Sequence, residues 1–216
     1  KEYSENEVEN ELIKISDKKI KYKKYENFED LCESTSKLLS ENKIIGWFQG
    51  RSEHGPRALG SRSILMNPCF EKNKDILNSK IKHREYWRPF AGVILEEYLE
   101  EYFENSIISP YMLFSMSCKK EKISKIPSVI HVDGTCRMQS INKDNNSKLT
   151  ILLNQFYNIS NIPVLLNTSF NDNGEPIVES PYDAIKCFLN IDLDYLVIDN
   201  FLVEKISVNT QKMFHF

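Results

Sequence analysis

Residues 163–177 read PVLLNTSFNDNGEPI, an apolar run that ends in a cluster of polar side chains. The run predicts a buried strand from Pro163 to Asn167. Three further polar side chains, Thr168, Ser169 and Asn171, follow directly. Ligands of α/β sheets usually bind where strands end, so this stretch predicts both a strand and a binding site beside it. A simple capping turn is the alternative interpretation.

On either side of this strand, the apolar periodicity predicts alternating helices and strands. We expect helices over residues 25–39, 71–81, 96–103, 149–157 and 181–189. We expect strands over residues 44–48, 90–95 and 111–118, around Gly134 within 129–141, and finally over 195–198. This alternation is typical of an α/β domain with a mixed sheet. Residues 1–25 are rich in lysine and glutamate and are predicted to be a linker or a processed end, which leaves 26–216 as one domain.

Composition narrows the class of protein. A chain of 216 residues, 41% of them hydrophobic, is long enough to bury one core. No apolar run approaches the roughly 18 residues of a membrane span, so we expect a soluble protein with no membrane partner. The five cysteines are scattered and lack zinc or redox spacing, which favours a reducing cytoplasm. A net charge of −3 gives no indication of a nucleic-acid partner.

The arginines are few and gathered in one region. Only six of the 28 basic residues are arginine: Arg51, Arg57, Arg62, Arg84, Arg88 and Arg137. A guanidinium binds phosphate or carboxylate with two parallel hydrogen bonds, so this distribution predicts an anion site. Four of the seven glycines fall within residues 46–60, where the backbone can approach an anion closely. Pairing with Glu53 or Glu85 is the alternative role for any one arginine.

Two more blocks carry candidate residues. Residues 78–90 read NSKIKHREYWRPF and place Lys82, Arg84 and Arg88 around a potential phosphate. Residues 131–139 read HVDGTCRMQ, where Asp133 and Thr135 flank a glycine close to an arginine. A solvated basic face and a plain β-turn are the respective alternatives. The histidines are too far apart for closely spaced metal ligands, and they are His54, His83, His131 and His215.

Taken together, these blocks closely resemble the C-terminal domain of the O-carbamoyltransferases, a family that includes nodulation-factor and antibiotic carbamoyltransferases. The resemblance runs from about Ile44 to Val203. It implies a YrdC-like fold, an open twisted mixed α/β sheet with flanking helices. YrdC-like sites carry a Lys-x-Arg pair and a Ser-x-Asn pair, which Lys82 with Arg84 and Ser169 with Asn171 match here.

The resemblance also implies a reaction. Carbamoyl phosphate yields carbamate, whose oxygen attacks the α-phosphate of ATP to give carbamoyl-adenylate and pyrophosphate, with Mg²⁺ as the accompanying ion. The catalytic residues it implies are Lys82, Arg84, Ser169 and Asn171. We expect substrate binding from Arg51, Arg57, Arg62, Arg88, Asp133, Thr135, Arg137, Asn167 and Thr168. The family members carry a TsaD-like, metal-binding domain that transfers the carbamoyl group to an acceptor, and this sequence offers no candidate for its metal site.

Two other functions compete with this interpretation. The chain could be an inactive nucleotide-binding or regulatory module that docks on a partner, although the intact Lys-x-Arg and Ser-x-Asn pairs argue against decay. It could also be a threonylcarbamoyl-adenylate synthase, which uses threonine and bicarbonate. Residues 50–60 and 131–139 match the carbamoyltransferases instead.

Overall fold

The computed structural model describes residues 1–206, apart from the side chains of Asp17 and Lys18. Nine strands join in one open mixed sheet, in the order β1-β9-β8-β2-β3-β7-β4-β6-β5. Their bounds are β1 Ile20–Lys24, β2 Ile45–Phe48, β3 Arg62–Met66, β4 Ala91–Leu95, β5 Ser115–Ser117, β6 Thr135–Ile141, β7 Val164–Ser169, β8 Tyr195–Ile198 and β9 Phe201–Lys205. The predicted α/β class with a mixed sheet is therefore confirmed.

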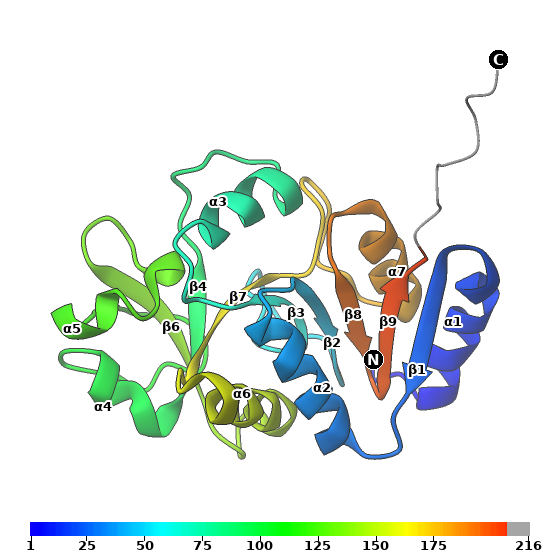
Figure 1. Ribbon diagram of the computed structural model, residues 1–216, viewed down its shortest axis with the longest axis horizontal. Coiled ribbons are helices and arrows are strands. Elements are labelled where there is room, and N and C mark those ends of the chain that lie inside the picture. Colours follow the sequence, from blue (N-terminus) through cyan, green and yellow to red (C-terminus); the bar gives the residue numbers. More distant parts are fainter. Residues whose placement is uncertain (207–216) are drawn as a thin grey trace.

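The strand quoted first, β7, lies in the middle of the sheet (Figure 1). It pairs antiparallel with both β3 and β4, while β2 with β8 and β4 with β6 are parallel pairs. Val164, Leu165 and Leu166 are fully buried, as expected of a strand covered on both faces. The carboxyl end of β7 lies beside the start of β4, because Asn167 is opposite Ala91 in the ladder.

Helices cover both faces of this sheet. The longer ones are α1 Glu5–Lys19, α2 Phe28–Ser40, α6 Ser147–Ser160 and α7 Pro181–Asn190. The shorter turns are α3 Asn73–Ile76, η1 Leu77–Ile81, η2 Glu96–Tyr98, α4 Leu99–Tyr102, α5 Lys120–Ile123 and η3 Pro127–Val129. Helices α2 and α6 pack against each other on the face toward the viewer in Figure 1, and α7 covers β2 and β8 from behind. In the part of the chain that the structure describes, no helix is long and apolar enough to cross a membrane.

The structure differs from the sequence prediction over residues 1–25. They form α1 and β1, and β1 pairs antiparallel with β9 at the edge of the sheet. Ser4 begins the helix with a capping box: its side chain accepts from the Glu7 amide, and the Glu7 side chain accepts from the Ser4 amide. Val8 and Leu12 are buried four positions apart, while Lys14 and Lys19 are exposed.

Other differences are confined to single strands. Residues 111–118 were predicted as one strand, but only β5 forms there. β9 follows β8 as the last strand of the described residues, and β3 forms in a stretch for which the sequence predicts no strand. Residues 129–141 start with the end of η3 and continue as β6. The remaining predicted helices and strands are present with small shifts at their ends.

Candidate functional site

The Lys-x-Arg and Ser-x-Asn pairs meet at the carboxyl end of β7. Lys82 Nζ donates to Ser169 O at 2.6 Å and to Asn171 Oδ1 at 2.7 Å, with longer contacts to Ser169 Oγ at 3.3 Å and Asn171 O at 3.2 Å. Ser169 Oγ in turn donates to Asn171 Oδ1 at 2.6 Å. The structure thus brings three of the four predicted catalytic residues into one hydrogen-bonded group.

Lys82 is 6% exposed, and its burial has an electrostatic consequence. Desolvation, with a smaller contribution from the charge of Arg84, lowers the pKa of Lys82 to about 7. The four oxygens around Nζ favour the ammonium form, as does Asp172. The pKa of the amine therefore lies near neutral pH, where a nearby anion can decide whether the amine is protonated.

Arg84 is held beside Lys82 by a turn of unusual geometry. Residues 77–81 form a single π-helical turn, η1, which ends with the Lys82 amide donating to Leu77 O at 2.8 Å. Arg84 Nε donates to Asn78 Oδ1 at 2.7 Å, and its guanidinium lies 4.6 Å from the centre of the Phe90 ring. Burial and the charge of Arg88 lower the pKa of Arg84.

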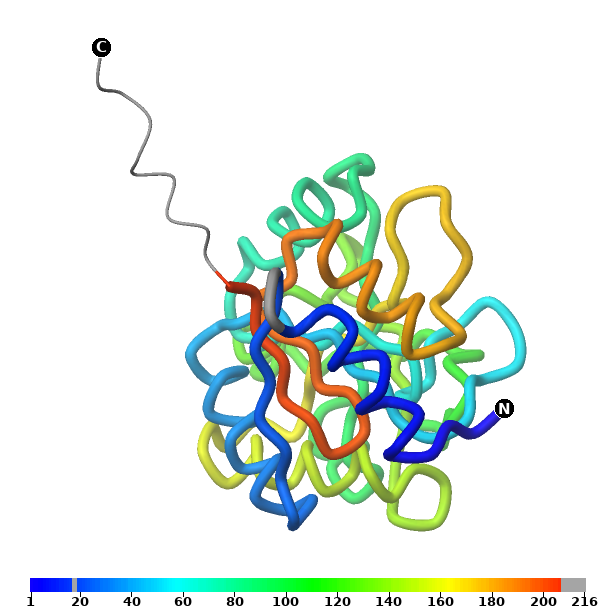
Figure 2. Tube along the Cα trace, turned by 90° about the vertical axis from the view of Figure 1, so that its right-hand side faces the viewer, coloured from blue at the N-terminus to red at the C-terminus, as the bar shows by residue number. Residues whose placement is uncertain are grey.

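Three adjoining hollows share Ser169. The first, of about 520 Å³, is lined by Lys82, Arg84, Arg88, Ser169, Asn171, Asp172 and neighbouring residues. The second, of about 120 Å³, includes Arg57, Arg84, Arg137, Asn167, Thr168 and Ser169 in its lining. The third, of about 470 Å³, lies between residues 52–56 and 171–179. The two loops that bound this third hollow project together at one side of the molecule in Figure 2, in cyan and in yellow to orange.

Arg57, Arg84 and Arg137 give the second hollow a strongly positive lining. Burial and the charge of Arg57 lower the pKa of Arg137. Its Nε atom is buried and has no hydrogen-bond partner among the described residues. Arg57 and Arg137 are like charges held close together, and an anionic ligand would relieve their repulsion and give the Arg137 Nε a partner.

Arg62, predicted to bind substrate, has a structural role instead. Its side chain is fully buried, with Nη1 donating to Gln49 O and Ser61 O, each at 2.9 Å, and Nη2 donating to Gly50 O at 3.0 Å. The guanidinium stacks 3.5 Å from the centre of the Phe48 ring. Burial lowers the pKa of Arg62 to about 10. Nη2 also donates to Glu179 O at 3.4 Å, while Nε is buried without a partner among the described residues. The structure thus places Arg62 beneath the glycine loop and not in the lining of the three hollows.

Four other predicted substrate residues lie at the rim of the site or outside it. Asp133 Oδ1 accepts from Thr135 N at 2.9 Å and Thr135 Oγ1 at 2.8 Å, which closes a turn and lowers the pKa of Asp133. These two residues line none of the three hollows, in keeping with the plain β-turn. Arg51 is exposed and also lines none of them. Arg88 lines the first hollow and pairs with Glu85 at 3.0 Å.

Positioning residues were missed by the sequence analysis. Glu53 Oε1 accepts from the amides of Leu59 at 2.8 Å and Ser61 at 2.6 Å, and so fixes the shape of the glycine loop. Asn78 Nδ2 donates to the carbonyl oxygens of Tyr86 at 3.2 Å and Arg88 at 3.0 Å. Both side chains bind backbone groups, which no spacing rule identifies from a single sequence.

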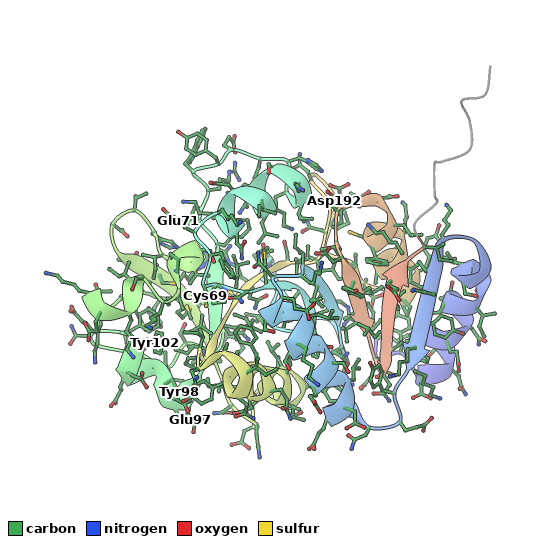
Figure 3. All side chains as sticks on the ribbon, in the orientation of Figure 1. Cys69, Glu71, Glu97, Tyr98, Tyr102 and Asp192 are labelled. Carbon is green, nitrogen blue, oxygen red and sulfur yellow. The ribbon has the colours of Figure 1, made fainter. Side chains whose placement is uncertain are left out.

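A further hollow lies elsewhere and has the opposite charge. It measures about 1030 Å³ and is lined by Glu29, Glu96, Glu97 and Glu100 among others. Glu96 follows the carboxyl end of β4. Because β4 and β7 are antiparallel, this is the opposite end of the strands from Ser169, and Figure 3 labels Glu97 there, near the bottom of the molecule. Clustered carboxylates repel phosphates, so this hollow does not fit the predicted substrates.

No group of three or more potential metal ligands is present within residues 1–206 as described. Mg²⁺ usually reaches such sites with its nucleotide, bound by phosphates, waters and one or two carboxylates. Two carboxylates line the first hollow, Asp172 and Glu85, and Glu85 is already paired with Arg88. The donor set therefore fits a metal that enters with a nucleotide.

A family model described as the carbamoyltransferase C-terminus matches residues 36–205. The chain belongs to this family. The matched region contains strands β2 to β9 and every residue that lines the three hollows. The predicted relationship to the carbamoyltransferase C-terminal domain is therefore confirmed.

Curated relatives of this carbamoyltransferase domain are much longer proteins. Nodulation protein NolO of Bradyrhizobium diazoefficiens is 44% identical over 186 residues, which cover 85% of this chain and 34% of that protein. Nodulation protein NolNO of Sinorhizobium fredii is 41% identical over 205 residues, 94% of this chain and 30% of that protein. The chain spans about a third of the length of these two relatives.

Solved structures give the fold of the carbamoyltransferase domain. The crystal structure of full-length HypF in the phosphate- and nucleotide-bound form matches with a TM-score of 0.57 and 19% identity, over 83% of this chain and 22% of that chain. HypF of T. kodakarensis matches with a TM-score of 0.52 and 14% identity, over 86% of this chain and 23% of that chain. With the nine-stranded sheet, these likenesses confirm the predicted fold class, an open mixed sheet with flanking helices related to the YrdC-like fold.

Proposed function

We propose that this carbamoyltransferase domain forms carbamoyl-adenylate from carbamoyl phosphate and ATP. The observation that carries the proposal is the convergence of Arg57, Arg84, Arg137 and Lys82 on the hollows around Ser169. Carbamoyl phosphate and a nucleoside triphosphate bring several negative charges together, and such a lining supports their binding in one place. Membership of the carbamoyltransferase family supports the same chemistry.

In this reaction carbamoyl phosphate is first hydrolysed to carbamate and phosphate. A carbamate oxygen then forms a bond to the α-phosphorus of ATP, and the bond to the bridging oxygen breaks with release of pyrophosphate. Arg84 and protonated Lys82 neutralise charge that develops on the phosphoryl oxygens. Ser169 Oγ and the Asn171 amide then turn their donors toward the phosphate of the adenylate. Mg²⁺, when bound with the nucleotide, neutralises the remaining phosphate charge.

The proposal is tested by ATP–pyrophosphate exchange on the purified chain, with and without carbamoyl phosphate. We expect exchange that requires carbamoyl phosphate and is lost in Lys82→Ala. Arg84→Ala should lower it by more than about tenfold, which corresponds to about 1.4 kcal/mol of transition-state stabilisation. Lys80→Ala is the matched control, because Lys80 is exposed on η1 and lines a different hollow. Exchange that is unchanged in Arg84→Ala contradicts the assignment.

The competing functions give different results in the same assay. An inactive nucleotide-binding module binds ATP and shows no exchange under any condition. A threonylcarbamoyl-adenylate synthase shows exchange that depends on threonine and bicarbonate instead. Substrate dependence therefore separates the three functions, whereas nucleotide binding alone does not.

Transfer to an acceptor belongs to a second proposal. The relatives extend well beyond the region that they share with this chain. We propose that a TsaD-like domain or subunit receives the adenylate and carbamoylates the acceptor. Mixing the chain with such a partner and an acceptor should release AMP in proportion to carbamoylated product, and the chain without the partner should not.

A further inference from the structure

Asn167 has a buried oxygen for which the fold provides no partner. Its side chain is 1% exposed, and Oδ1 has no hydrogen-bond partner among the described residues. A buried amide oxygen without a donor lowers the stability of the fold, so its retention needs an explanation. Asn167 lines the second hollow together with Arg57, Arg137 and Ser169, which makes a ligand the natural donor.

The orientation of the Asn167 amide is fixed by its other end. Nδ2 donates to Gln139 Oε1 at 3.0 Å and to Ala58 O at 3.3 Å, both of them acceptors. Gln139 cannot be turned around, because its Nε2 donates to Leu59 O at 2.7 Å. This chain of bonds leaves Oδ1, which only accepts, as the free end of the side chain.

Position along β7 relates this oxygen to the reacting group. Side chains alternate along a strand, so Asn167 and Ser169 face the same side, and both line the second hollow. The arginines of that hollow offer donors alone, and Asn167 Oδ1 offers an acceptor. A ligand that satisfies both has anionic oxygens at one end and an N–H donor at the other. A carbamoyl group attached to phosphate has this arrangement.

We infer that Asn167 Oδ1 accepts a hydrogen bond from the amino group of the carbamoyl substrate and so selects it over acyl phosphates without that group. The inference rests on the proposed function and deepens it, since it names the residue that recognises the NH₂ group. Arg57, Arg84 and Arg137 bind the anionic part, which carbamoyl and acetyl phosphates share. Asn167 Oδ1, as a hydrogen-bond acceptor, therefore discriminates between carbamoyl phosphate and acetyl phosphate.

Two stable ligands that differ at one group test this inference. Phosphonoacetamide carries an NH₂ group where acetonylphosphonate carries a methyl group, and both have the same phosphonate. By titration calorimetry, the wild-type chain should bind phosphonoacetamide at least about tenfold more tightly, because the methyl group leaves Oδ1 unpaired. In Asn167→Leu, which is close in shape and has no acceptor, the two affinities should become equal. Inorganic phosphate should still bind this variant.

The outcomes separate the inference from the function on which it rests. Equal affinities in the wild-type chain overturn the role of Asn167, while exchange that depends on carbamoyl phosphate leaves the proposed function intact. Persistent discrimination in Asn167→Leu overturns it as well. If Asn167→Leu does not fold or bind phosphate, Asn167→Ser gives the second test, with a reduced ratio expected since its hydroxyl is shorter. Binding of neither analogue, with no exchange, contradicts both proposals.

Discussion

Arg57 lies in the glycine-rich loop and Arg62 begins β3 directly after it. The sequence predicts the same role for both arginines, yet burial gives them different roles. Arg57 is exposed at the second hollow, and Arg62 is fully buried under the loop. Arg62→Ala should lower the free energy of unfolding by about 3 kcal/mol, because several backbone carbonyls lose a charged donor. Arg57→Ala should weaken binding of carbamoyl phosphate analogues and leave stability within about 0.5 kcal/mol. Urea unfolding and titration calorimetry measure the two effects.

A lysine at position 62 distinguishes charge from geometry. Arg62→Lys keeps the positive charge and loses the planar fork that reaches Gln49 O, Ser61 O and Gly50 O. It should remain nearly as unstable as Arg62→Ala. A stable Arg62→Ala protein that no longer binds ligand would instead return Arg62 to the substrate-binding residues.

Lys82 makes ligand binding depend on pH. Its pKa of about 7 leaves the amine mostly neutral at pH 8, and a bound polyanion raises that pKa because it favours the ammonium form. ATP binding at pH 8 should therefore take up a proton, and affinity should fall as the pH rises above 7. Calorimetry in buffers of different ionisation enthalpy measures the uptake. In Lys82→Met it should vanish, and undiminished uptake there assigns the proton to another group.

The same pKa sets the sign of a stability effect in the free protein. The folded chain holds fewer protons on Lys82 than the unfolded chain between about pH 7 and the ordinary pKa of lysine. Stability therefore rises with pH across this window as far as Lys82 contributes, and the gain is complete above the unfolded pKa. At neutral pH the buried Lys82 thus lowers the stability of the free protein, and it places an amine at the proposed phosphate site.

At the scale of elements, α1 is a helix that packs on the core although its sequence has few apolar residues and predicts a linker. Leu12 is fully buried in α1, whereas the adjacent Ile13 is 55% exposed. Leu12→Ala should cost about 2–5 kcal/mol of stability, because it opens a cavity in the core. Ile13→Ala, its matched control, should change stability by less than about 0.5 kcal/mol. Chemical denaturation of both variants decides whether α1 belongs to the folded domain or is an appendage.

The π-helical turn η1 shows which feature of a helix apolar periodicity cannot predict. Apolar spacing predicts the helix over residues 71–81, and α3 with η1 confirms it. The wider final turn cannot be predicted in this way, because it depends on Asn78 binding the loop at Tyr86 and Arg88 and on Lys82 reaching Ser169. β3 escapes prediction for a related reason, since its role follows from pairing with β2 and β7 rather than from its own pattern.

At the scale of the whole molecule, the site gathers residues from four distant segments of the chain. Arg57, Arg84, Arg137 and Ser169 become neighbours only through the order of the strands. Arginine content and the family resemblance predicted that they would serve one anion site. The sequence could not show that Arg62 turns inward or that Asp133 binds its own turn, because those outcomes depend on the burial and the local hydrogen bonds of each side chain.

Charge distribution over the molecule leads to the last prediction. The chain carries a net charge of −3, and the hollow beside Glu96 and Glu97 is acidic, yet the hollows around Ser169 hold clustered cations. Attraction of phosphates to this local field is screened by salt, since the Debye length falls from about 10 Å at 0.1 M to about 3 Å at 1 M. Raising KCl from 0.05 to 0.5 M should weaken ATP binding by at least about threefold. Adenosine, which has no charge, should bind with an affinity that does not change, and equal salt dependence of the two ligands would mean that the cationic cluster does not hold the phosphates.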